Sequence, residues 1–109
     1  MAIPHASPGQ PIDIRPLGPA IAAARTVALF KTDQIEVMRL MLPVGKSVPS
    51  HKVAGEITIQ CLEGKIDITA GGRSQVLCAG ELVYLSGGVP HSLHAIEDAS
   101  ALVTIVLGR

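Results

Sequence analysis

Aromatic side chains are almost absent from this sequence of 109 residues, which contains one Phe, one Tyr and no Trp. Surfaces that stack nucleotide bases or sugars are built from several aromatic side chains, so this composition excludes such a surface. The formal net charge is zero and no basic run occurs, so we expect no nucleic-acid partner. No apolar run approaches the ~20 residues of a membrane-spanning helix, so we expect no membrane association.

Cysteine is also scarce, because Cys61 and Cys78 are the only two in the chain. Both lie in apolar, strand-like stretches, and we expect free thiols in a reducing cytoplasm rather than a disulfide. Hydrophobic residues make up 48% of the sequence and charged residues 17%, a balance that predicts a packed core. The length suits one domain.

Short β-type runs separated by glycine, proline and aspartate fill most of the sequence. Residues 65–70 alternate, and Gly71-Gly72 leads from them into residues 73–78, which predicts a hairpin. The runs 34–42, 81–85 and 101–107 are largely apolar and suit strands packed on both sides. About eight such runs predict an all-β, antiparallel barrel or sandwich over residues 12–109. The sequence further predicts an extended, proline-rich arm over residues 1–11 and one short helix near residues 19–24.

Two segments of the chain each place one histidine at a fixed distance after a turn glycine. His51 follows Gly45 by six residues, and His91 follows Gly80 by eleven. The spacing resembles the two signature motifs of the cupins, small β-barrels whose pocket often holds a metal. The resemblance implies a single cupin-type antiparallel β-barrel, a jelly roll or double-stranded β-helix of the RmlC-like kind.

The metal ligands of the cupin motifs are only half present. The family type holds Fe, Mn, Ni or Zn with three imidazoles and a carboxylate. In this chain His51 and His91 occupy two of the four ligand positions, whereas Val53 and Ile57 occupy the other two. We therefore expect a divalent transition metal, if one binds at all, to bind weakly.

Strand register decides whether a third ligand reaches the histidines. A β-bulge after Val53 would turn Glu56 and Gln60 into the barrel, and a site of His51, His91 and Glu56 would result. Without the bulge, the inner wall would consist of the alternate residues Ile57, Ile59 and Cys61. Alternation of the sequence is compatible with both registers.

The predicted pocket opens at one end of the barrel, and His51 and His91 approach each other across its interior. Its walls are expected from Met41, Ile59 or Gln60, Cys61, Leu93 and Val103. His94 has the opposite strand parity from His91 and is expected to point outward. Arg39, in an apolar run, is expected to form a salt bridge at an interface or to reach into the pocket.

Two main functions remain open on the sequence. The first is a small-molecule-binding cupin with an incomplete metal site. The alternative is a metal-dependent enzyme, such as a dioxygenase, isomerase or decarboxylase of a small organic acid, using His51, His91 and Glu56 or Gln60. An epimerase-like mechanism with a His base and a Tyr acid is disfavoured by the single tyrosine. We expect a homodimer whose two-fold interface includes part of residues 12–42, with residues 12–14 adding an edge strand to the neighbour.

Overall fold

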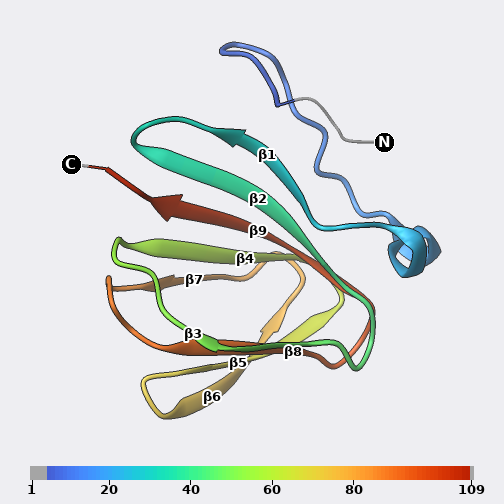
Figure 1. The fold of residues 1–109 in the computed structure, drawn as a ribbon. Coiled ribbons are helices and arrows are strands. Elements are labelled where there is room, and N and C mark those ends of the chain that lie inside the picture. The colour runs from blue at the N-terminus through green and yellow to red at the C-terminus, as the bar shows by residue number, and fades with distance from the viewer. Residues whose placement is uncertain (1–4, 109) are drawn as a thin grey trace.

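Two antiparallel β-sheets lie face to face in the computed structural model, which describes residues 5–108 (Figure 1). The described molecule measures 37 × 36 × 22 Å along its principal axes. In chain order the elements are η1 (Gly18–Ala23), β1 (Val27–Lys31), β2 (Ile35–Leu42), β3 (Ser47–His51), β4 (Ile57–Glu63), β5 (Lys65–Ala70), β6 (Arg73–Cys78), β7 (Leu82–Leu85), β8 (His91–Ala95) and β9 (Ala99–Val106).

The chain alternates between the two sheets in the manner of a jelly roll. One sheet has the strand order β1-β2-β9-β4-β7 and the other has the order β3-β8-β5-β6. Neighbouring strands in both sheets pair antiparallel, and β9 pairs with β2 on one side and with β4 on the other. The predicted all-β, antiparallel barrel of cupin type is therefore confirmed.

Local sequence signals account for several of these elements. Gly71 and Gly72 have φ angles of 58° and 79°, so both occupy the left-handed region that a two-residue hairpin turn requires. The turn joins β5 to β6, with Ala70 opposite Arg73, as the sequence predicted. The predicted short helix is the 3₁₀-helix η1, which buries Ile21 to 1% exposure.

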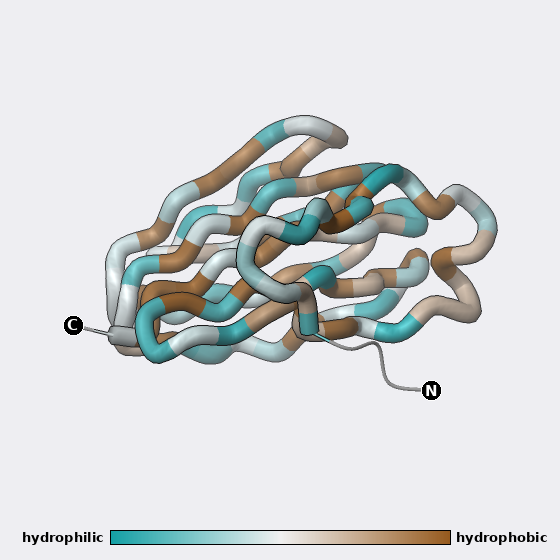
Figure 2. The backbone as a smooth tube through the Cα atoms, turned by 90° about the horizontal axis from the view of Figure 1, so that it is seen from above, coloured by the Kyte–Doolittle hydropathy of each residue, from teal (hydrophilic) through white to brown (hydrophobic). Residues whose placement is uncertain are grey.

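The core lies between the sheets and takes alternate residues from each strand, so apolar and polar residues alternate along the chain (Figure 2). On β4, Ile57, Ile59 and Cys61 are exposed by only 4%, 1% and 0%. Their inward position shows that no bulge reverses the facing of this strand. Of the two registers that the sequence left open, the structure has the one with an apolar inner wall.

The N-terminal segment runs beside β1 before it enters η1 (Figure 1), and it lines a cavity together with the outer face of β1 and β2. Its residues 5–17 form no helix or strand, and the backbone N–H of Ala6 donates to the carbonyl of Leu29 in β1 at 2.9 Å. The predicted arm of residues 1–11 lies partly outside the described residues. Within residues 5–108, no helix is long and apolar enough to cross a lipid bilayer.

Candidate functional site

His51 and His91 meet at one end of the barrel. His51 ends β3, His91 begins β8, and the two residues are opposite each other in the β3–β8 pairing. The ring centroids lie 4.4 Å apart with an angle of 54° between the ring planes. The prediction that these histidines approach each other is correct. The expectation that they do so across the barrel interior was wrong. They are neighbours in the same sheet, rather than partners across the interior.

The two rings differ in their exposure to solvent. His91 is 2% exposed, whereas His51 is exposed. His51 Nδ1 lies 3.1 Å from the carbonyl oxygen of Pro49, and His91 Nδ1 lies 3.0 Å from that of Val89. A carbonyl oxygen only accepts hydrogen bonds, so each Nδ1 carries the proton. In the neutral rings both Nε2 atoms therefore keep their lone pairs.

Apolar side chains surround this end of the barrel. Leu93, two residues after His91 on the same face of β8, is 3% exposed and belongs to the core. The loop of residues 52–56 joins His51 to Ile57, and Ile57 is aligned with Leu85 and Ile105 in the facing sheet. The histidine pair thus lies at an end of the barrel whose interior is lined by apolar side chains.

Glu56 and Gln60 do not join the histidines. The Glu56 carboxylate is exposed and accepts a hydrogen bond from the Tyr84 hydroxyl at 2.6 Å. Gln60 lies on the outer face of the five-stranded sheet, because β4 turns Ile59 and Cys61 inward. Within residues 5–108, no three His, Cys, Asp or Glu side chains are placed to hold a metal ion together. The predicted set of His51, His91 and Glu56 is therefore not assembled, and the donors present do not fit the four-ligand centre of the family type.

Two further residues were wrongly assigned to the pocket wall. Met41 is buried, but β2 directs it to the outer face of the sheet, where it lines a cavity under the N-terminal segment. The inward residues of this strand are Met38, Leu40 and Leu42, which belong to the core. Cys61 faces inward as expected, yet it lies four residues along β4 from Ile57, or ~13 Å from the histidine end. For Met41 the error was in the face of the strand, and for Cys61 it was in the end of the barrel.

His94 is exposed, as its strand parity predicted. Its Nδ1 atom lies 2.7 Å from the Ser47 hydroxyl on the neighbouring strand β3. His5 is likewise exposed. Neither residue takes part in the pair at the end of the barrel.

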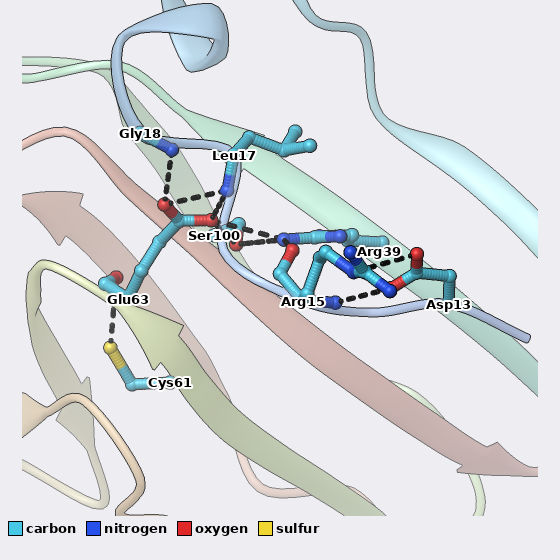
Figure 3. Close-up of polar contacts among 8 residues, drawn as sticks. All are labelled: Asp13, Arg15, Leu17, Gly18, Arg39, Cys61, Glu63 and Ser100. Carbon is cyan, nitrogen blue, oxygen red and sulfur yellow. Dashed lines mark hydrogen bonds and ion pairs between the residues drawn. The ribbon is translucent and has the colours of Figure 1, made fainter.

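A second polar cluster joins the N-terminal segment to the outer face of the five-stranded sheet (Figure 3). Arg39 Nη2 forms an ion pair with Glu63 at 3.0 Å and also donates to the Arg15 carbonyl at 2.8 Å. The Glu63 carboxylate further accepts from the Ser100 hydroxyl at 2.8 Å. Arg39 thus forms a salt bridge within the chain, rather than reaching into the barrel.

Glu63 was missed as an important residue, because it stands in a turn-like phrase before Gly64. Its carboxylate also accepts the backbone N–H groups of Leu17 and Gly18, at distances of 2.9–3.0 Å. Burial disfavours the charged form, but the hydrogen bonds from Leu17, Ser100 and Gly18 and the charge of Arg39 outweigh it and lower the pKa of Glu63. The one available signal was the unpaired Arg39 in an apolar strand, which requires a buried acidic partner.

The family assignment rests on sequence as well as on fold. A family model described as Cupin domain matches residues 38–107, which is more than half of the chain. The protein therefore belongs to the cupin family. No curated protein matches the chain.

Solved structures share the fold at low sequence identity. A conserved protein of unknown function from Streptococcus pyogenes superposes with a TM-score of 0.77 at 17% identity, covering 100% of this chain and 96% of that one. KdgF from Halomonas sp. gives a TM-score of 0.70 at 15% identity, with coverages of 77% and 78%. The DMSP lyase DddQ from Ruegeria pomeroyi gives 0.69 at 21% identity, with coverages of 74% and 45%. At these identities the likeness concerns the fold alone.

Proposed function

We propose that the protein binds a small organic molecule at the end of the barrel, through the Nε2 atoms of His51 and His91. The observation that carries this proposal is the pairing of two rings at 4.4 Å whose Nδ1 atoms are both already bound to backbone carbonyls. An apolar site with a few convergent polar groups is the usual form of a small-ligand site. The ligand class we infer is a small organic acid or its enol.

The tautomer determines which ligand groups suit the pair. Two neutral rings present two acceptors, which match a hydroxyl, an enol or a protonated carboxyl group. When one ring gains a proton, its Nε2 becomes a charge-assisted donor that suits a carboxylate.

The metal-dependent enzyme has less support. Its third ligand would have to be Glu56 or Gln60, but Glu56 is exposed in the loop before β4 and Gln60 lies on the outer face of β4. Two imidazoles rarely hold a divalent metal ion tightly without a further protein ligand. We therefore place binding of an organic ligand ahead of metal-dependent catalysis.

Proton NMR of the histidine rings tests the binding proposal with pyruvate as the probe. We expect the ring signals of His51 and His91 to shift and to saturate as pyruvate is added. His94 and His5 are built-in controls and should keep their positions. Equal shifts at all four histidines, or no saturable shift at His51 and His91, would contradict the proposal.

Two further expectations remain proposals. Cys61 and Cys78 are both free thiols, which supports a place in the reducing cytoplasm. A two-fold homodimer also remains a prediction. Leu82 and Tyr84 leave 60% and 56% of their surfaces exposed on the edge strand β7, so the apolar surface available to a partner extends beyond residues 12–42. Light scattering at micromolar concentration checks the dimer, and a monomer mass would contradict it.

A further inference from the structure

A second candidate site lies on the opposite side of the five-stranded sheet from the barrel interior. The N-terminal segment and the outer face of β1 and β2 line an open cavity of about 490 Å³. This volume is within the range of small-ligand pockets. Its walls include the apolar side chains of Ile12, Leu17, Val27, Leu29 and Met41. The five-stranded sheet separates this cavity from the histidine pair.

Arg39 supplies a buried, partly unsatisfied cation to this cavity. Its side chain is 5% exposed, and its Nε and Nη2 atoms bond to Ser100, Glu63 and the Arg15 carbonyl. For Nη1, no hydrogen-bond partner is found anywhere in residues 5–108. Every fully buried side-chain nitrogen or oxygen in this part of the chain has a partner. Nη1 must therefore reach open space, and Arg39 lines the cavity.

The remaining charges favour an anion. Arg25 also lines the cavity and forms no ion pair with another described residue. Asp13 is on the same wall, but it pairs with Arg15 at 2.9 Å. Around the cavity, three guanidinium groups therefore face two carboxylates, those of Asp13 and Glu63. One positive charge is left without an acidic partner.

We propose that this cavity binds a carboxylate with a short aliphatic chain, with the carboxylate on Arg39 Nη1 and Arg25 and the chain against Leu29 and Met41. The planar guanidinium matches a carboxylate geometrically. The apolar walls exclude water from the aliphatic part. This site is independent of the histidine pair, and it would stand if the proposed function of that pair failed.

Titration of the ¹⁵N-labelled protein with octanoate tests the site. We expect saturable shifts of the backbone amides of Val27, Leu29 and Met41, whether or not the rings of His51 and His91 respond. Octan-1-ol, which lacks the charge, should bind about tenfold more weakly. Arg25→Gln should weaken the binding of octanoate by about tenfold for the same reason, and the spectrum of the variant should still be that of a folded protein.

Matched variants make the test specific. Arg73→Gln removes the same charge from the exposed strand β6 of the other sheet and should leave octanoate affinity unchanged. Ala24→Phe, which fills the cavity, should abolish saturation. Absence of saturable binding, equal effects of Arg25→Gln and Arg73→Gln, or shifts confined to the histidine end would overturn the proposal. Cavity amides that respond to protein concentration but not to octanoate would overturn it too, since a second copy would then be the occupant.

Discussion

The Glu63 carboxylate and the histidine pair differ in how completely their hydrogen-bonding groups are used. On the outer face of the five-stranded sheet, the Glu63 carboxylate accepts from Leu17, Gly18, Arg39 and Ser100. At the end of the barrel, His51 and His91 each use Nδ1 on a backbone carbonyl. For their Nε2 atoms, the described residues offer no partner.

This difference separates a structural role from a binding role. A buried ion pair whose remaining lone pairs are satisfied fixes the position of the segments that supply its donors. Here it ties the N-terminal segment and η1 to the sheet. A pair of rings that are oriented by the backbone but still free at one nitrogen is prepared for an external partner. Removing the Glu63 carboxylate should change stability, whereas removing the histidine rings should change binding at the end of the barrel.

The largest expected effect on stability is that of Glu63→Ala. The substitution leaves the buried Arg39 guanidinium and the N–H groups of Leu17 and Gly18 without their acceptor. We expect a loss of about 3 kcal/mol in the free energy of unfolding, measured by urea denaturation. Glu97→Ala is the matched control, because the exposed pair of Glu97 and Lys65, 3.8 Å apart, should contribute less than about 0.5 kcal/mol. Equal losses in the two variants would show that the cluster does not anchor the segment.

Acid should remove the contribution of Glu63. Its pKa is lowered in the folded protein from the ordinary value of 4.5, so the unfolded chain binds the proton first as the pH falls. The stabilisation from the Glu63 carboxylate is complete above pH 4.5. It is lost as the pH falls through the lower pKa that Glu63 has in the folded protein. The stability difference between the parent and Glu63→Gln should therefore be largest at neutral pH and should diminish in acid. A difference that stays constant from pH 7 to pH 3 would contradict the assignment.

Thiol reactivity gives a smaller but sharp contrast between core and surface. Burial raises the pKa of Cys61 to about 11, and its Sγ donates to the Glu63 carbonyl at 3.3 Å. Cys78 is exposed. A thiol reagent at pH 8 should modify Cys78 rapidly and Cys61 only after denaturant is added. Rapid modification of both thiols in the native protein would show that the core end of β4 opens readily.

Much of the fold could be predicted, because alternation and turn glycines act locally. The β5–β6 hairpin followed from the alternating residues 65–70 and from Gly71-Gly72, and the two motif histidines correctly indicated a cupin barrel. Leu93 faces the same side of β8 as His91, because parity is fixed within one short strand.

The remaining features depend on contacts between distant segments. Met41 was assigned to the wrong face because residues 34–42 are apolar on both faces, and the outer face is buried only by the N-terminal segment. Glu63 gained its role from Leu17 and Gly18, which lie more than forty residues earlier. No periodicity in β4 or β2 reports such pairings.

The central claim is that the backbone holds both histidines with the proton on Nδ1 and leaves both Nε2 atoms free. Long-range ¹H–¹⁵N correlation spectra of the histidine side chains at pH 8 test it directly. In the neutral form of both rings, the structure predicts a proton on Nδ1 and a lone pair on Nε2. A protonated Nε2 on either neutral ring would contradict the account, because the pair would no longer offer two acceptors.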